Sequence, residues 1–302
     1  MKELTNFDVI IIGGSYAGLS AGMSLGRSLR KVLIIDSGKP CNRQTPHSHN
    51  FITHDGEKPA YIAQKAKEQV LQYDTVQFID DLVSGAKKTE NGFTVTTQSG
   101  RVFNAKKIIF ASGVKDTMPD IKGFADCWGI SVIHCPYCHG YEFKSKKTAI
   151  MANAERAFHL AMLVNNLTDD ITIIAPSVSE FTEEQLFKLK THNIEIITKA
   201  ITDIQHEEGY VQHLVFEDGE KRNFEAVYAG IPFEQSATLP FELGCELTEM
   251  GHIKIDAFQK TTIEGIFACG DNSSPMRSVA NAVHAGNLAG AMVNAEITKE
   301  HF

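Results

Sequence analysis

The chain has 302 residues, enough for about two domains at the usual 100–200 residues each. Its 43% hydrophobic and 22% charged residues are ordinary globular usage, which excludes a disordered, collagen-like or coiled-coil chain. The 29 basic and 37 acidic residues leave a formal net charge of −8, which argues against nucleic acid as a partner. No apolar run approaches the ~20 residues that cross a bilayer, so we expect no membrane segment.

The first part of the chain has the pattern of a βαβ unit. A continuous apolar run at 7–12 ends in two glycines, as expected of a strand buried on both faces. Apolar residues then recur at helical spacing over 17–29, and a second strand-like run follows at 31–35. The sequence further predicts a helix at 60–73, a hairpin formed by 92–97 and 101–104, and a buried strand at 107–111.

A second unit with the same pattern begins near residue 148. The predicted elements are strands at 148–151, 171–175 and 194–197, helices at 155–167 and 182–192, β segments at 211–216 and 221–227, then a strand at 265–270 and a helix at 278–297. We therefore expect an α/β protein with two Rossmann-like, three-layer ββα nucleotide-binding domains, the second inserted into the first. The expected boundaries are 1–116 with 234–302 for the first domain and 117–233 for the second.

The turn after the first strand predicts a dinucleotide site. It reads Gly13-Gly14-Ser15-Tyr16-Ala17-Gly18, in which Gly13 allows the tight turn and Gly18 close helix–strand packing. Ser15 replaces the middle glycine, but its hydroxyl can donate to phosphate. Asp36 closes the second strand, where a carboxylate accepts ribose hydroxyls. A glycine turn that binds nothing is the alternative.

Two later motifs connect the chain to a family. Ala111-Ser112-Gly113 follows a predicted strand, and Gly265–Asp271 (GIFACGD) lies near the end. With GGSYAGLSA before them, they resemble the FAD-binding half of the pyridine-nucleotide–disulfide oxidoreductases. Chain length and a central CxxC make the chain most similar to the low-molecular-weight thioredoxin reductases, and the resemblance covers nearly the whole chain. It implies FAD in the first domain, contacts to the cofactor from Ala111, Gly113, Gly270 and Asp271, and a homodimer.

The stretch Cys135-Pro136-Tyr137-Cys138 predicts a redox centre. Two cysteines at this spacing form a reversible dithiol/disulfide pair and lower one thiol pKa. Zinc held with the flanking histidines is the competing interpretation, but zinc usually takes a second ligand pair from elsewhere. The remaining cysteines are scattered singly, so we expect no metal and interpret them as small buried or loop residues: Cys41, Cys127, Cys245 and Cys269. Six cysteines are too few for a secreted scaffold, and no signal-peptide pattern precedes the first strand, so we expect a cytoplasmic protein.

The resemblance assigns different roles to the two cysteines. Cys138 would face the flavin as the charge-transfer thiolate, and Cys135 would meet the external substrate. His139 stands where the thioredoxin reductases have an acidic residue, and His134 lies on the other side of the motif. Either imidazole can shuttle protons or stabilise a thiolate; the alternative is that both are polar loop residues. The CPYCHGYE pattern looks closer to flavin-dependent dithiol oxidases, which pass electrons to oxygen.

The turn of the second βαβ unit has alanines where a dinucleotide-binding turn has glycines. It reads Ala152-Asn153-Ala154-Glu155-Arg156-Ala157, with methyl groups where pyrophosphate oxygens would approach. Glu155 adds a negative charge at the helix N-terminus, and the following loop, 175–179, has no Lys or Arg for a 2′-phosphate. The sequence thus argues against tight NADPH binding.

These observations predict an FAD-dependent thiol–disulfide oxidoreductase that oxidises a dithiol with O2 as acceptor. The alternatives are a thioredoxin reductase fed by NADPH or by a protein donor such as ferredoxin, and a non-catalytic flavin redox sensor. The substrate class is a thioredoxin-like protein or a small dithiol. Four further histidines could contact substrate or be ordinary surface or helix residues: His47, His49, His54 and His284.

Overall fold

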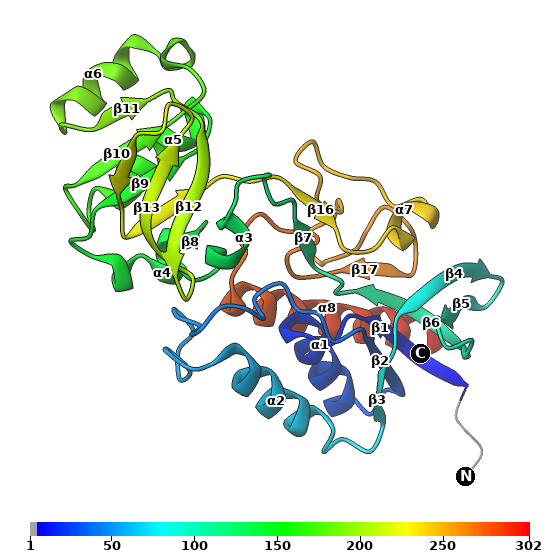
Figure 1. The fold of residues 1–302 in the computed structure, drawn as a ribbon. Coiled ribbons are helices and arrows are strands. Elements are labelled where there is room, and N and C mark those ends of the chain that lie inside the picture. Colours follow the sequence, from blue (N-terminus) through cyan, green and yellow to red (C-terminus); the bar gives the residue numbers. More distant parts are fainter. Residues whose placement is uncertain (1–4) are drawn as a thin grey trace. The chain divides into compact units, whose positions relative to one another are not determined.

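The computed structural model describes residues 5–302, which form two compact units (Figure 1). The first consists of the described residues up to Arg43, Phe51–Lys115 and Phe233–Phe302. The second consists of Gln44–Asn50 and Asp116–Pro232. The chain passes between them through strands β7 (Val114–Asp116) and β16 (Phe233–Gln235), which pair with each other.

The short segment Gln44–Asn50 was expected in the first domain, but its contacts place it in the second unit. Gly129 of that unit lies directly against it: a Cβ built there would be 2.9 Å from Thr45 Oγ1 and 3.3 Å from Gln44 Cγ. Such contacts are long-range packing, which local sequence pattern does not encode. The segment therefore belongs by packing to the unit that carries the CxxC.

The first unit is built on a seven-stranded sheet with the order β3-β2-β1-β6-β5-β4, in which β17 also pairs with β6. Its strands are β1 (Asn6–Ile12), β2 (Val32–Asp36), β3 (Val76–Asp80), β4 (Val83–Thr89), β5 (Gly92–Thr97), β6 (Val102–Phe110) and β17 (Ile266–Ala268). Strands β3, β2, β1, β6 and β17 run parallel, whereas β5 and β4 extend the sheet antiparallel. The apolar residues of β1, Phe7 and those from Val9 to Ile12, all contribute to a core because both faces of the sheet are covered.

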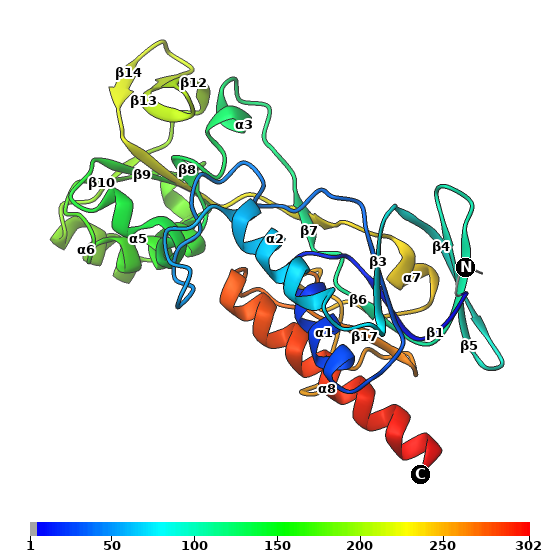
Figure 2. The ribbon, with the colours of Figure 1, turned by 90° about the horizontal axis from the view of Figure 1, so that it is seen from below.

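Successive side chains of β1 point to opposite faces of the sheet and pack into two different cores. Val9 and Ile11 pack toward the helices, while Ile10 and Ile12 pack on the opposite face. The helices of the first face are α1 (Tyr16–Arg27), α2 (Pro59–Val70) and α8 (Val279–His301), and Figure 2 shows α1 running alongside α8. The opposite face is covered by the β4–β5 hairpin and by the segment that contains α7 (Leu239–Glu242).

The second unit repeats this three-layer plan. Its parallel sheet has the order β11-β10-β9-β15-β8 and consists of β8 (Val132–Ile133), β9 (Thr148–Met151), β10 (Ile171–Ile174), β11 (Glu195–Ile197) and β15 (Ala226–Ala229). Helices α5 (Ala154–Val164) and α6 (Glu183–Thr191) pack on one face. The other face packs on an antiparallel sheet of β12 (Ile201–Glu207), β13 (Tyr210–Phe216) and β14 (Lys221–Asn223). The expected fold class, with the second domain inserted into the first, is confirmed.

The connecting segments of this unit hold four short helices: α3 (Phe124–Cys127), α4 (Pro136–His139), η1 (Tyr141–Phe143) and η2 (Val178–Glu180). Within residues 5–302, no helix combines the length and apolar composition needed to cross a bilayer.

Three element predictions need correction. The two strands expected at 101–104 and 107–111 are one strand, β6, because its first half pairs with β5 and its second half with β17. The single β segment expected at 221–227 is divided between two sheets, as β14 and β15. Helix α1 ends at Arg27 because Leu29 adopts a left-handed φ of 56° and is 80% exposed.

Candidate redox and cofactor sites

The glycines of the turn between β1 and α1 stand where there is no room for a side chain. Gly13 has a φ of 106°, and a Cβ there would lie 2.2 Å from the carbonyl oxygen of Ala111. A Cβ on Gly18 would lie 1.9 Å from the carbonyl oxygen of Gly13. Ser15 is the N-cap residue of α1, yet its side chain makes no capping hydrogen bond, so the hydroxyl is not used by the helix itself. The turn thus presents a helix N-terminus and a hydroxyl to an anion.

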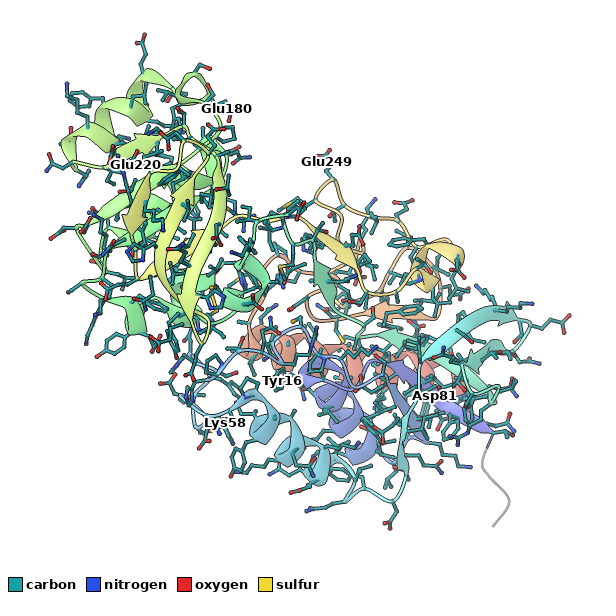
Figure 3. All side chains as sticks on the ribbon, viewed as in Figure 1. Tyr16, Lys58, Asp81, Glu180, Glu220 and Glu249 are labelled. Atoms are coloured by element: carbon teal, nitrogen blue, oxygen red, sulfur yellow. A yellow bond between two sulfur atoms is a disulfide. The ribbon has the colours of Figure 1, made fainter. Side chains whose placement is uncertain are left out.

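The carboxylate of Asp36 is fixed beside this turn. The N–H of Gly14 donates to Asp36 Oδ1 at 2.8 Å, and the N–H of Gly38 donates to Oδ2 at 3.1 Å. Tyr16, labelled in Figure 3, lies at the start of α1, and its hydroxyl donates to the carbonyl of Pro59 at 3.0 Å. The first two hydrogen bonds orient the carboxylate that the sequence predicts for ribose binding, and the third joins α1 to the beginning of α2.

The two later motifs meet at the same edge of the sheet. Gly113 follows β6 and Asp271 follows β17, and the two strands are parallel neighbours with Ala268 opposite Phe110. The turn into Asp271 needs glycine because Gly270 has a φ of 88°. Cofactors of α/β sheets bind outside the carboxyl ends of parallel strands, which is where these residues lie.

Two residues at this edge were missed by sequence reasoning although both closely follow Asp271. The side chain of Asn272, fully buried, donates to the carbonyl of Phe110 at 2.9 Å and joins β17 to β6. Arg277 Nε lies 3.7 Å from Asp271 Oδ2, as does Cys41 Sγ. Together, the N-terminus of α1 and the carboxylates of Asp36 and Asp271 form a donor and acceptor set that fits FAD.

The two cysteines of the CxxC form a disulfide, with their Cα atoms 5.3 Å apart. Helix α4 begins at Pro136, a residue well suited to the first helical position. Its N-cap is Cys135, whose Sγ accepts a hydrogen bond from the N–H of Cys138 at 3.2 Å. Both cysteines are half-buried, while Tyr137 between them is 68% exposed. The predicted redox pair is thus assembled in its oxidised state.

Gly140 directly follows helix α4 and packs closely against Leu167 and against Tyr228 of strand β15. A Cβ at Gly140 would be 2.3 Å from the carbonyl oxygen of Pro136, 2.5 Å from Leu167 Cδ1 and 3.0 Å from Tyr228 Oη. Tyr228 is only 1% exposed. Its burial, together with the nearby charge of Glu142, raises the pKa of the phenol well above its ordinary value.

The two histidines that flank the CxxC lie in different surroundings. The ring of His134 stacks on Trp128, with centroids 5.9 Å apart. His139 is half-buried and faces His49 and Glu142. Burial lowers the pKa of His139, the neighbouring His49 lowers it further, and Glu142 raises it.

The other predicted candidates are spread over both units. The ring of His47 lies 6.4 Å from that of His49, whereas His54 stacks on Phe51 at 5.8 Å and His284 is exposed on α8. Cys127, Cys245 and Cys269 are buried free thiols, as the sequence predicted. Burial raises the pKa of Cys127 and of Cys269 to about 12, which keeps these thiols protonated and unreactive.

The turn between β9 and α5 makes hydrogen bonds among its own residues. Asn153 is the N-cap of α5, and its side chain accepts the N–H of Arg156 at 3.1 Å. The methyl groups of Ala152 and Ala154 are buried. In the loop after β10, Ser177 Oγ accepts the N–H of Ser179 at 3.1 Å. The N–H of Arg156, which a pyrophosphate would use, therefore already has an acceptor. The sequence reasoning missed this feature, although Asn is a common N-cap residue.

Comparisons with known proteins agree with this geometry. Residues 7–286 match the family model described as pyridine nucleotide-disulphide oxidoreductase. The chain is 34% identical to the thioredoxin reductase sirT of Leptosphaeria maculans, over 95% of this chain and 93% of that protein. It is 30% identical to the thioredoxin reductase tcpT of Claviceps purpurea, over 96% of this chain and 94% of that protein.

A solved structure supports the same assignment. The crystal structure of an oxidoreductase from Agrobacterium tumefaciens superposes with a TM-score of 0.91 at 36% identity, covering 97% of this chain and 99% of that one. The match spans both units, the cofactor motifs and the CxxC. The chain belongs to the pyridine nucleotide-disulphide oxidoreductase family and is a thioredoxin reductase-like flavoprotein disulfide oxidoreductase.

Proposed function

We propose that this protein is an FAD-dependent thiol–disulfide oxidoreductase that oxidises a dithiol substrate and passes the electrons to O2, without NADPH as donor. One observation carries the proposal. The unit with the CxxC disulfide has a turn of the kind that binds nicotinamide cofactors, but Asn153 of that turn already accepts the N–H of Arg156. The first unit would hold FAD, and the second would serve to carry the redox centre.

The argument against NADPH rests on the backbone donors and the charges of the second turn. Asn153 already accepts the N–H of Arg156, and Glu155 places a negative charge in the first turn of α5. The loop 175–179 contains no basic residue for a 2′-phosphate. Losing two charge-assisted hydrogen bonds of about 1.5–3 kcal/mol each would weaken NADPH binding roughly 10²–10⁴-fold.

The thiol chemistry needs no residue beyond the CxxC and a base. A substrate thiolate attacks Cys135 Sγ, the Cys135–Cys138 bond breaks, and Cys138 leaves as a thiolate. The second substrate thiol loses its proton and attacks the substrate sulfur of this mixed disulfide, which releases Cys135. The substrate leaves as a disulfide, and the pair has gained two electrons.

FAD, when bound, supplies the two-electron acceptor that reoxidises the cysteine pair and delivers those electrons, with two protons, to O2 as H2O2. The residues that would hold it are the β1–α1 turn, Asp36 at the ribose and Asp271 after β17. The roles of Cys138 as the thiolate next to the flavin and of Cys135 as the thiol that meets the substrate are part of the proposal. The contacts proposed for Ala111, Gly113 and Gly270 come from the same edge of the sheet.

We further propose a thioredoxin-like protein or a small dithiol as substrate and a cytoplasmic homodimer as the working form. The substrate class is supported by the names of the relatives, which are thioredoxin reductases. The location is supported by three free thiols, Cys127, Cys245 and Cys269, which persist best in a reducing compartment. Light scattering on a size-exclusion column tests the dimer.

Oxygen consumption tests the proposed reaction. With dithiothreitol as substrate, the purified flavoprotein should consume O2 and form one H2O2 for each dithiol oxidised, and Cys138→Ser should abolish both. Added NADPH should support neither reaction. NADPH-dependent reduction of thioredoxin would instead establish the thioredoxin reductase alternative, and reduction that requires ferredoxin would establish a protein donor.

A further inference from the structure

The thiol exchange needs a base, and three ionisable side chains lie close together near the CxxC. His49 Nε2 lies 3.5 Å from Glu142 Oε1. The ring of His49 meets that of His139 edge-on, with centroids 6.4 Å apart. His139 is the last residue of α4, and Glu142 lies three residues later in η1.

These groups come from two distant parts of the sequence. Glu142 and His139 are near neighbours in the chain, but His49 is delivered by the segment Gln44–Asn50, which packs within the second unit. The side chain of His49 is 21% exposed and that of Glu142 is 37% exposed. The pair is therefore partly screened from solvent, and Glu142 still reaches water.

We propose that His49 and Glu142 form a relay that positions His139 and controls its protonation during dithiol oxidation. This inference rests on the proposed function of the CxxC. The neutral imidazole of His139 accepts the proton that a substrate thiol releases when its sulfur attacks, and becomes an imidazolium. Glu142 stabilises that cation, and His49 Nε2 holds the Glu142 carboxylate in place. The proton then leaves to solvent, so no electron is moved by the relay.

The electrostatics around His139 give the two relay members opposite effects. Glu142 raises the pKa of His139, whereas His49 lowers it. Tyr228, on β15 beneath the helix, faces Glu142, which raises the pKa of the phenol together with burial. Helix α5 also packs against α4 and carries the titratable residues Glu155, Arg156 and His159. The charges that act on the pKa of His139 are those of His49 and Glu142.

The opposite effects of Glu142 and His49 on the pKa of His139 can be tested, and a purely structural role of these residues would not produce them. Flavin reduction by dithiothreitol is followed anaerobically by stopped flow over the pH range in which histidine titrates. Because neutral His139 is the active form, the rate should fall on the acid side of the profile as His139 becomes protonated. This fall, the acid limb, should move to lower pH in Glu142→Gln, which lacks the charge that raises the pKa of His139. It should move to higher pH in His49→Gln, which lacks the group that lowers that pKa. His139→Gln should lose the limb and react about 10²-fold more slowly.

Two controls complete the design. His159→Gln changes an exposed histidine of α5, whereas the charges that act on the pKa of His139 are those of His49 and Glu142, so its profile should match that of the wild type. Glu142→Asp keeps the charge and should restore the wild-type limb, which separates loss of charge from loss of folding.

A second readout is independent of electron transfer to the flavin. The reduced CxxC of the holoenzyme is alkylated with iodoacetamide across the same pH range, and the profile should shift in the same two directions. If both variants shift the limb in one direction, or neither shifts it, the relay is wrong. If dithiothreitol fails to reduce the wild-type flavin, the proposed function is wrong, and the alkylation profiles still decide the relay.

Discussion

Replacing Gly140 with alanine should displace the end of the CxxC helix from its packing against Leu167 and Tyr228. The added methyl carbon would lie 2.3 Å from the carbonyl oxygen of Pro136 and 2.5 Å from Leu167 Cδ1. Ordinary carbon contacts are about 3.5–4.0 Å, so each distance is short by about 1 Å or more. Leu167 is half-buried and can turn aside, but the Pro136 carbonyl is part of the helix that carries both cysteines.

The expected cost is that of overpacking, about 1–3 kcal/mol. Gly85→Ala is the matched control: its φ is not positive, and the nearest atom to a new Cβ is Thr96 Cβ at 4.0 Å. That change should be neutral or stabilising by up to about 1 kcal/mol. Only the first change should therefore destabilise the protein, although the chemical change is identical.

Thermal unfolding and hydrogen exchange of the two variants check this reasoning. Gly140→Ala should unfold at a lower temperature, with faster exchange confined to the residues around α4 and η1, and should react more slowly with dithiothreitol. Gly85→Ala should unfold at the wild-type temperature or slightly above it and should match the wild type in the other two assays. Equal thermal stability and equal dithiol reactivity of both variants would refute the packing argument for Gly140.

Three further predictions follow from the two sites. Cys138→Ser should bind FAD normally, yet dithiols should no longer bleach the flavin absorbance; unchanged bleaching would contradict the role of the pair. Asp36→Asn removes the charge that accepts the N–H groups of Gly14 and Gly38, and fluorescence titration of the apoprotein should show at least about tenfold weaker FAD binding, at 1.5–3 kcal/mol per charged hydrogen bond. His252 is buried, and burial together with Arg277 lowers its folded-state pKa, so the unfolded chain takes up a proton first as the pH falls below about 6.5. Stability present above that pH should therefore decline toward the lower folded-state pKa, and His252→Gln should flatten this part of a plot of unfolding temperature against pH; an unchanged slope would argue against the effect of His252.

The parts of the fold that sequence predicts well are those with strong local patterns. The apolar runs of β1 and β9 identify buried strands directly, because parallel strands are covered on both faces. Strand β3 was missed because VQFID mixes polar and apolar residues, and only Val76 is fully buried. Its place at the sheet edge next to β2 is a tertiary property.

The candidate sites divide along the same line. Cys135 and Cys138 are local in sequence, and the dinucleotide turn and Asp36 are separated by a single βαβ unit, so spacing alone suggests them. The proximity of His49 to His139 depends on the folding of Gln44–Asn50 onto the second unit, for which no local signal exists. The hydrogen bond from Arg156 to Asn153 lies between these cases, since Asn before a helix is a recognisable capping signal.

Anaerobic titration of the yellow protein tests the central claim most directly. Visible flavin absorbance is followed while dithiothreitol, NADPH or NADH is added in stoichiometric amounts. The account predicts bleaching by one equivalent of dithiol and no bleaching by either pyridine nucleotide. Rapid bleaching by one equivalent of NADPH would contradict it, because a nucleotide would then bind productively at a turn whose helix donor Asn153 occupies.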